Sequence, residues 1–482
     1  MISKLRDKWK GMSLEVKASL AYTVCSILMK CLSFITMPLF TRLLTTEQYG
    51  QYSVYLSWSG ILVIFTTLNL AYGSFSTAMV RFEKDRWGYV SALQGLCCIL
   101  SLVFLAIYLP FTGAWNQLFE LPTPLVFLLV VEILGQFAVS CYYGVQRFEY
   151  KYKSVVLLTL LNAVASPLAA FILVSSTQEK GYARIVGYAL ANITIGIVIF
   201  ILNSRKGKGK LFRKEYWKYA LSFNIPLIPY YLSQVIFNQS DRIMISHLVG
   251  TDKAGMYSVA YTLGTILTFV LNAINNSYVP WLYTRIKEDR GQENRSISNG
   301  IALLMAFLLL GVMAVAPEII LIMAGQEYRE AIWVVPSVAM SILLLFYSQL
   351  FINIEFYYEE KTMLVWGSIG AAVLNIVLNW LLIPMFGFVA AGYTTLASYV
   401  AFAVANYFTM RIMAKRKQVR CDFFDMKALL LIFACFAALG FLAMALYELP
   451  VVRYIIIAGV LLALLILRKK VTEFVKSVLV RK

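Results

Sequence analysis

The chain has 482 residues, of which 60% are hydrophobic and 14% charged, and its mean hydropathy is +0.73. Soluble globular proteins carry about 25% charged residues, so this composition excludes a soluble protein and indicates an integral membrane protein. The formal net charge is +18. We interpret it as a basic rim that faces anionic lipids, in preference to a nucleic-acid-binding surface.

Long apolar stretches follow one another along the whole chain. A membrane span needs about 20 mostly apolar residues. Fourteen stretches meet this requirement, at residues 17–41, 52–80, 88–109, 124–145, 154–175, 182–203, 218–246, 254–283, 298–324, 331–357, 362–383, 388–411, 427–447 and 451–468. The sequence therefore predicts an all-α integral membrane protein with about 14 transmembrane helices. The basic N-terminal segment leads directly into a full span, so we expect no cleaved signal peptide.

A short motif occurs twice at a fixed separation. Residues 46–54 read TEQYGQYSV and residues 251–259 read TDKAGMYSV, a separation of 205 residues, and a Gly-Tyr pair recurs at the same separation at 187–188 and 392–393. This pattern indicates a duplicated unit of roughly 200 residues, with chance similarity between two hydrophobic halves as the alternative.

The duplication predicts the domain organisation. Six helices per repeat is an even number, so both repeats enter the membrane in the same direction and form parallel lobes. We predict an N-lobe at 1–203, a basic cytoplasmic linker at 204–217, a C-lobe at 218–411, and two further helices with a basic cytoplasmic tail at 412–482.

Basic residues predict the orientation, because lysine and arginine accumulate on the cytoplasmic side of the membrane. With the N-terminus inside, the cytoplasmic segments hold 35 of the 43 basic residues, the external segments hold 6, and Lys30 and Arg242 lie within helices. Both termini are therefore predicted to be cytoplasmic.

Four separated segments carry a family resemblance. They read PLFTRLLTTEQYGQYSV at 38–54, NQSDRIMISHLVGTDKAGMYSVAY at 238–261, APEIILIMAGQEYREA at 316–331 and NWLLIPMFGFVAAGY at 379–393. The chain resembles the Wzx-type bacterial polysaccharide flippases of the multidrug/oligosaccharidyl-lipid/polysaccharide exporter superfamily. Many such flippases have a twelve-helix pattern, whereas two extra helices occur in the related lipid II flippases, so the subgroup stays open.

The resemblance implies a function. Such a protein moves an undecaprenyl-diphosphate-linked oligosaccharide from the cytoplasmic to the external leaflet of the bacterial inner membrane, for a capsule, an O-antigen or another surface glycan. Alternating access by rocking of the two lobes requires no covalent chemistry, cofactor or metal ion. The implied partners are the lipid-linked oligosaccharide, membrane lipids, a polysaccharide polymerase and other assembly proteins, and no nucleic acid.

The first helix has one polar face. Tyr22, Ser26, Lys30 and Ser33 follow at spacings of four, four and three residues. A lysine near the middle of a span costs about 2.5–3.5 kcal/mol on insertion scales, so Lys30 should face protein or water. Three interpretations stay open: contact with the substrate phosphates, a structural ion pair, or a helix placed incorrectly.

Acidic residues occur within two other predicted spans. Glu132 lies one turn before Gln136 in the fourth helix, and Asp241 lies one turn after Asn238 in the seventh. Glu132 and Asp241 are candidates for binding a coupling ion or for pairing structurally. Arg242 is turned by about 100° from Asp241, so Arg242 either enters the cavity or caps the helix with Asp241 at the outer interface.

Amide side chains add candidate substrate contacts. Asn238, Asn272 and Asn276 lie within predicted helices. Asparagine can hydrogen-bond sugar hydroxyls, and in membranes it equally often bridges helices. The substrate-binding set that we predict is thus Lys30, Arg242, Asn238, Asn272 and Asn276.

Two other functional classes compete with a flippase. A multidrug/cation antiporter of the same superfamily would share the duplication, but a cationic substrate favours acidic over basic cavity residues, and Lys30 argues against it. A polysaccharide polymerase or ligase usually needs a sizeable external catalytic loop. The longest external connection predicted here, residues 110–123, contains one acid, Glu120, and no base.

Overall fold

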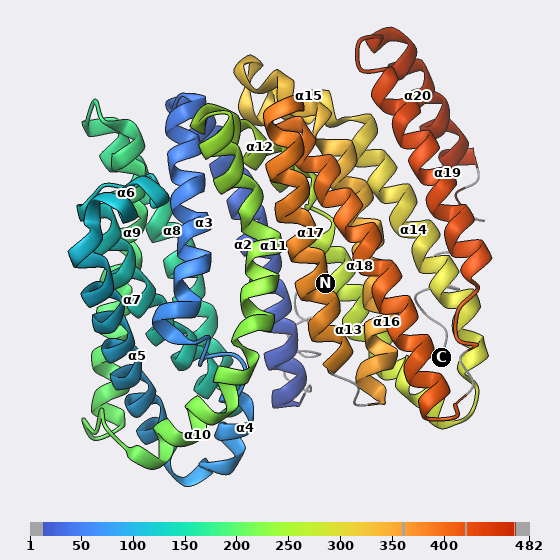
Figure 1. Ribbon diagram of the computed structural model, residues 1–482. Helices are drawn as coiled ribbons and strands as arrows, with labels where there is room; N and C mark the ends of the chain where they lie inside the picture. The colour runs from blue at the N-terminus through green and yellow to red at the C-terminus, as the bar shows by residue number, and fades with distance from the viewer. Residues whose placement is uncertain (1–12, 359–361, 420–421, 467, 469–482) are drawn as a thin grey trace, which may run out of the picture. The chain divides into compact units, whose positions relative to one another are not determined.

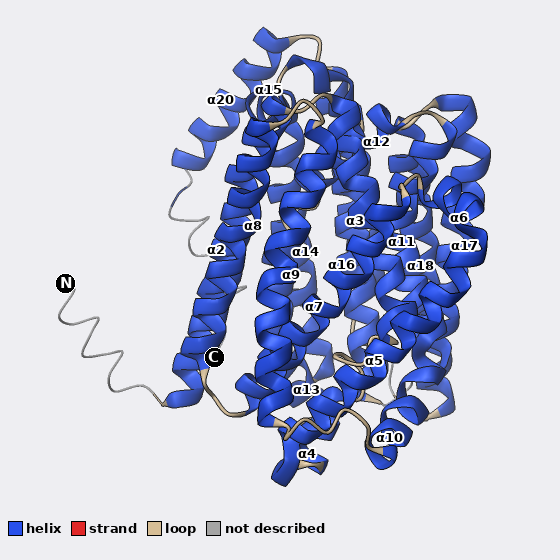
Figure 2. Cartoon of the chain, turned by 90° about the vertical axis from the view of Figure 1, so that its left-hand side faces the viewer, coloured by secondary structure: helices blue, strands red, loops and turns tan. Residues whose placement is uncertain are grey.

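The computed structural model describes residues 13–358, 362–419, 422–466 and 468. Within these ranges all regular secondary structure is helical, so the prediction of an all-α protein is confirmed (Figure 2). Packing divides the chain into two compact units, Met1–Ile243 and Met244–Lys482. The lobe boundaries predicted from the repeat stay a prediction.

The first unit contains the helices from α2 to most of α11 (Figure 1). They are α2 (Leu14–Leu43), α3 (Thr46–Thr67), α4 (Phe75–Arg81), η1 (Glu83–Asp85), α5 (Arg86–Tyr108), η2 (Leu109–Phe111), α6 (Thr112–Phe119), α7 (Thr123–Phe148), α8 (Tyr152–Ser176), α9 (Lys180–Lys206), α10 (Lys214–Asn224), η3 (Ile225–Leu227) and α11 (Ile228–Leu248).

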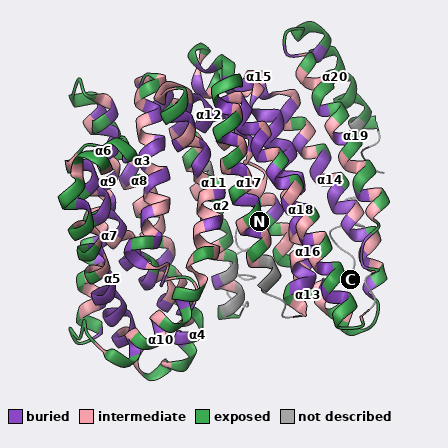
Figure 3. Ribbon diagram, viewed as in Figure 1, coloured by how far each residue is buried: buried purple, intermediate pink, exposed green. Residues whose placement is uncertain are grey.

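The second unit contains the remaining helices, and α16 is buried along most of its length (Figure 3). They are α12 (Thr251–Gly264), α13 (Thr268–Lys287), η4 (Gly291–Glu293), α14 (Asn294–Ala314), α15 (Ala316–Ala324), η5 (Gln326–Trp333), α16 (Val335–Tyr357), α17 (Thr362–Phe386), α18 (Val389–Arg416), α19 (Met426–Ala445) and α20 (Pro450–Ile466).

Each of the fourteen predicted spans coincides with helical structure. In the described residues, eleven helical segments are long and apolar enough to cross a membrane. The other three are α3, α18 and α20. Small and hydroxyl-bearing residues lower the hydropathy of α3 and α18, many of whose side chains are buried within their own units. The third, α20, is a shorter apolar helix in its described part.

Four predicted spans are interrupted. The stretch 218–246 divides into α10 and α11 around η3, whose first turn contains Pro226. The stretch 52–80 breaks after α3, because Leu68 and Asn69 adopt left-handed φ angles of 48° and 52°. The stretch 298–324 breaks at Val315, and Pro317 opens α15. The stretch 254–283 breaks between α12 and α13, where Thr265 donates its hydroxyl hydrogen bond to the Tyr261 carbonyl at 2.8 Å. Each break has a local backbone cause that hydropathy does not report.

The predicted linker is ordered at both ends. The helix α9 continues to Lys206, and α10 begins at Lys214. Arg213 forms an ion pair with Asp85, and the Tyr216 hydroxyl donates to Asp85 Oδ2 at 2.8 Å. These contacts hold the start of α10 against the connection between α4 and α5. The other predicted connection, 110–123, is also partly helical, because it contains η2 and α6.

Helix pairing recurs in the two units. In the first, α9 packs against α7 and α8, and in the second, α18 packs against α16 and α17. The glycine of the repeated Gly-Tyr pair has a packing role in the first unit, because a Cβ atom on Gly187 would lie 2.5 Å from the Cα atom of Ala170. A side chain at this position would force α8 and α9 apart.

Candidate functional site

A polar cavity of about 290 Å³ lies inside the first unit, between α2, α8 and α9, with one wall from α3. Its polar lining consists of hydroxyl, amide, phenol and guanidinium groups. These belong to Ser33, Thr36, Tyr52, Asn162, Ser166, Arg184, Tyr188 and Asn192.

The helical repeat explains how these groups converge. In α9, Arg184, Tyr188 and Asn192 follow at intervals of four residues, so they share one face of the helix. In α8, Asn162 and Ser166 have the same spacing. Polar faces of two adjacent helices therefore line the same space within otherwise apolar segments.

Arg184 supplies the positive charge of the cavity lining. The residue is only 8% exposed. Its guanidinium carbon lies 3.2 Å from the ring centroid of Phe40 and 4.3 Å from that of Tyr52. Aromatic faces attract a guanidinium group, and the attraction grows as water is excluded. The two rings thus restrict the orientation of this cation.

A buried carboxylate lies directly behind the cavity wall. Glu132 of α7 is fully buried and accepts three hydrogen bonds. The Tyr55 hydroxyl donates to Oε2 at 2.5 Å, while the side-chain amides of Gln136 and Asn192 donate to Oε1 at 2.6 and 2.8 Å. Four side chains from three helices therefore form one polar network in the interior of the unit.

Asn192 connects this network to the cavity. Its amide nitrogen binds Glu132, and its amide oxygen accepts a hydrogen bond from the Ser166 hydroxyl at 3.2 Å. Both Asn192 and Ser166 line the cavity. A change in the charge of Glu132 would consequently alter the hydrogen bonding of the cavity wall.

The predicted second repeat has different residues at the corresponding positions. At the separation of 205 residues, the positions that correspond to Tyr55, Glu132 and Asn192 are Ala260, Ser337 and Ala397. The position that corresponds to Arg184 is Val389. At this separation, neither Glu132 nor Arg184 has a charged counterpart.

Three of the predicted substrate-binding residues belong to the first unit, as do Glu132 and Asp241. The backbone of Lys30 lies in α2, one turn before the cavity-lining Ser33, and its side chain lies outside the described residues. Asn238 is exposed, and its amide donates to the Gln234 carbonyl at 2.7 Å. Arg242 is half-buried and donates to the Asn238 carbonyl at 2.9 Å and to Gln239 Oε1 at 3.0 Å.

The remaining predicted residues have separate surroundings. Asp241 is buried in α11. Asn272 and Asn276 lie in α13 of the second unit, and both are exposed. Their neighbour Asn275 accepts a hydrogen bond from Asn353 at 2.9 Å and bridges α13 to α16. The proposed roles of these residues in substrate binding stay predictions.

The sequence reasoning missed Arg184. It counted this residue among the external basic residues, although the predicted span 182–203 contains it, and the structure places it one turn inside α9. A signal was available: Arg184 lies four residues before Tyr188 of the repeated Gly-Tyr pair, and therefore on the same helical face.

Comparison with known proteins identifies the family. Residues 16–287 match the family described as polysaccharide biosynthesis protein. A Haemophilus influenzae protein of the Lsg locus is 21% identical over 376 residues, which make up 75% of this chain and 89% of that protein. An uncharacterized membrane protein of Haemophilus influenzae is 24% identical over 291 residues, or 57% of this chain and 66% of the relative.

Solved structures show the same fold. The lipid II flippase MurJ in an inward closed conformation has a TM-score of 0.64 and 13% identity, with 91% of this chain and 100% of that chain covered. An inward-facing multidrug resistance MATE family transporter of the MOP superfamily has a TM-score of 0.56 and 14% identity, with 81% and 96% covered. The family match spans more than half of the chain, so the chain belongs to the polysaccharide biosynthesis protein family, and its fold is like those of MurJ and MATE.

Proposed function

We propose that this protein is a flippase for undecaprenyl-diphosphate-linked oligosaccharide repeat units used in the biosynthesis of a cell-surface polysaccharide. It carries them from the cytoplasmic to the external leaflet of the bacterial inner membrane, with both of its termini in the cytoplasm. The observation that carries the proposal is the cavity of the first unit, where Arg184 lies among amide and hydroxyl groups inside apolar helices.

The cavity chemistry suits the diphosphate end of this substrate. A guanidinium group binds phosphate oxygens through several N–H donors. Asn162, Asn192 and Ser166 offer donors and acceptors for sugar hydroxyls. A cavity of about 290 Å³ is at the lower end of the range of ligand sites, so it accommodates the diphosphate and the adjoining sugar and not a complete oligosaccharide.

The mechanism we propose is alternating access without covalent chemistry. The two halves rock about the bound headgroup while the prenyl chain stays in lipid. Lys30 and Arg184 neutralise the diphosphate charge. The charge state of Glu132 affects the cavity wall through its hydrogen bond with Asn192, which lines the cavity. A polymerase and other assembly proteins would then receive the external product.

One observation favours a second candidate, a multidrug/cation antiporter. Glu132 is a buried carboxylate that accepts three hydrogen bonds from neutral donors. Such a group can exchange a proton or a small cation during transport. Arg184 in the same cavity disfavours a cationic drug as the substrate. A polymerase or ligase lacks comparable support.

Reconstitution distinguishes these candidates. Proteoliposomes would contain a fluorescent lipid-linked oligosaccharide, and a membrane-impermeant quencher would report the leaflet in which the glycan lies. We expect movement by the native chain and a loss of about tenfold in rate for Arg184→Ala, because a phosphate contact is removed. Arg205→Ala is the matched control, since Arg205 lies exposed at the other end of α9. Efflux of ethidium without glycan movement would instead identify the antiporter.

A further inference from the structure

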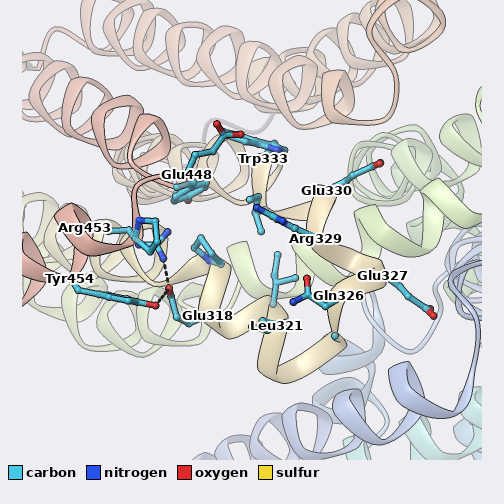
Figure 4. Close-up of a pocket in the computed structure, with 16 residues that line it drawn as sticks. Glu318, Leu321, Gln326, Glu327, Arg329, Glu330, Trp333, Glu448, Arg453 and Tyr454 are labelled. Carbon is cyan, nitrogen blue, oxygen red and sulfur yellow. Dashed lines mark hydrogen bonds and ion pairs between the residues drawn. The ribbon is translucent and has the colours of Figure 1, made fainter.

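A second cavity, of about 570 Å³, lies in the second unit between α15, η5 and the turn that joins α19 to α20 (Figure 4). Binding sites for small molecules have volumes of about 300–1,000 Å³, so this space is large enough for a specific ligand.

One side of the cavity carries a buried arginine with unused donors. Arg453 is 3% exposed and forms an ion pair with Glu318, which also accepts a hydrogen bond from the Tyr454 hydroxyl at 2.7 Å. Within the part of the chain that the structure describes, Nε and Nη1 of Arg453 and Oε2 of Glu318 are buried without a hydrogen-bond partner. Such groups are costly to leave unsatisfied, so a ligand that accepts from Arg453 and donates to Glu318 would be stabilised here.

Aromatic rings form further parts of the wall. Trp333 and Tyr447 lie with ring centroids 5.6 Å apart, and the Tyr447 hydroxyl donates to the Met313 carbonyl at 2.8 Å. This bond and the neighbouring Arg453, whose guanidinium carbon is 5.7 Å from the Tyr447 centroid, hold the ring in place. Figure 4 shows Trp333 and Glu448 on one side of the cavity and Tyr454 with Glu318 on another.

This combination matches the chemistry of a sugar. The C–H face of a pyranose ring packs against an aromatic side chain, while a hydroxyl group both accepts and donates. Neighbouring hydroxyls can therefore accept from Arg453 and donate to Glu318 at the same time. A purely apolar ligand would leave both groups unsatisfied.

The charge of the lining narrows the class of sugar. Four glutamates line the cavity, Glu318, Glu327, Glu330 and Glu448, against two arginines, Arg329 and Arg453. Lys253 pairs with Glu330, so one carboxylate remains in excess, and this negative charge repels phosphate groups and uronic acids. The lining therefore favours uncharged or amino sugars.

The cavity lies at a defined end of the second unit. Lys253, at the start of α12, pairs with Glu330 of η5 at 2.6 Å, so the start of α12, η5 and the turn between α19 and α20 share that end. The basic-residue asymmetry predicts that this end faces outward.

We propose that this cavity is a glycan-binding site that receives an uncharged or amino sugar of the headgroup on the external side. The statement that this sugar belongs to the transported headgroup rests on the proposed flippase function. The inference that the cavity binds a sugar rests on its lining residues alone.

The test is saturation-transfer NMR on the full chain in nanodiscs, with N,N′-diacetylchitobiose, glucose, glucuronic acid and glycerol phosphate as probes. We expect chitobiose or glucose to bind, and glucuronic acid and glycerol phosphate to bind more weakly. Trp333→Ala and Arg453→Lys should each weaken sugar binding about tenfold, since one loses the aromatic face and the other the planar donor fork. Trp366→Ala is the matched control, because Trp366 is 69% exposed on α17.

Three results would overturn the proposed sugar site. The first is preferential binding of glycerol phosphate, which would identify a site for a lipid headgroup. The others are no binding of either uncharged sugar, and unchanged sugar binding in both variants. The translocation assay separates this outcome from failure of the flippase proposal. Sugar binding without glycan translocation would reject the flippase proposal and support the sugar site. Translocation without sugar binding would support the flippase proposal and reject the sugar site.

Discussion

The Tyr55 hydroxyl lies 2.5 Å from Oε2 of Glu132 and joins α3 to α7 in the interior of the first unit. Asn192 binds the other carboxylate oxygen from α9. One carboxylate therefore ties together three helices and also contacts the wall of the cavity. It can contribute to stability and to transport, and the two contributions require separate measurements.

The stability contribution is tested by truncating the network. Glu132→Ala would leave the donors of Tyr55, Gln136 and Asn192 without their acceptor, at a cost of about 1–3 kcal/mol for each group that stays buried and unsatisfied. Tyr55→Phe removes a single donor and should cost less. We expect the midpoint of thermal unfolding in detergent to fall markedly for Glu132→Ala and slightly for Tyr55→Phe. Equal midpoints for both variants and the native chain would show that the network is not stabilising.

The transport contribution is tested by Glu132→Gln, which keeps the size of the side chain but removes its charge. If Glu132 exchanges a proton or cation, the variant should transport without a response to an imposed pH or sodium gradient, while the native chain responds. Flux would be measured in proteoliposomes with each gradient applied separately. A gradient response that persists in Glu132→Gln would exclude this carboxylate from coupling.

The aromatic contacts of Arg184 give a graded prediction. Phe40→Leu removes the ring that lies 3.2 Å from the guanidinium carbon, whereas Tyr52→Phe keeps a ring on the other side. Cation–π contacts contribute about 0.5–2 kcal/mol, so Phe40→Leu should reduce the apparent affinity for the lipid-linked substrate about 2- to 30-fold. The Tyr52→Phe variant should have an apparent substrate affinity close to that of the native chain. Concentration-dependent flux gives the affinity, and a larger effect of Tyr52→Phe would contradict the role of the rings.

Lys30 is predicted to meet the substrate. Lys30→Ala should abolish glycan export at near-normal membrane abundance, and Lys30→Arg should keep part of the activity because the charge is preserved. Export is measured as surface polysaccharide and abundance by immunoblot of membranes. Full export by a stably expressed Lys30→Ala protein would remove this residue from the site.

Membrane potential should drive transport. A diphosphate carries about two negative charges, and moving one charge across 100 mV changes the free energy by about 2.3 kcal/mol, so outward movement from a negative interior gains about 4–5 kcal/mol. Cationic groups that stay near the middle of the membrane cancel only part of this gain. We expect an inside-negative potassium-diffusion potential to accelerate flux at equal pH and sodium. A transport rate that depends on sodium or proton gradients alone would reject a role for the membrane potential as the driving force.

Topology can be checked at two sites. In a variant that lacks the seven native cysteines, Lys208→Cys in the linker should react with impermeant thiol reagents only from the cytoplasmic side. Gly113→Cys in α6 should react from outside, and a Cβ atom there meets no other group within 4 Å. Labelling of Lys208→Cys from outside would invert the predicted orientation.

The sequence predicted the helices far better than the site. Apolar stretches of sufficient length identify spans because lipid requires every backbone polar group to be paired within the helix. Breaks within those stretches, as at Leu68, depend on single backbone conformations that composition does not encode. Of the polar face predicted on α2, Ser33 lines the cavity, and the role of that face stays a prediction.

Pairings between distant helices were beyond prediction from one sequence. Glu132 and Asn192 are separated by 60 positions, and their hydrogen bond follows from the packing of α7 against α9. The packing itself depends on close approach at Gly135, where a Cβ atom would lie 3.2 Å from the Cα atom of Gly196. Arg184 was overlooked because a charge near a helix end normally reaches solvent, whereas here Phe40 and Tyr52 enclose it.

The repeated motif predicts equivalent positions for Tyr52 and Tyr257, and the ring of Tyr52 faces Arg184. Its counterpart is fully buried in α12 and lies beside Tyr261, with ring centroids 5.8 Å apart. The two tyrosines therefore have different surroundings: Tyr52 lies beside a buried cation, and Tyr257 lies beside a second phenol ring. A duplicated unit, as the sequence predicts it, would thus keep one motif in two different chemical settings within a single polypeptide.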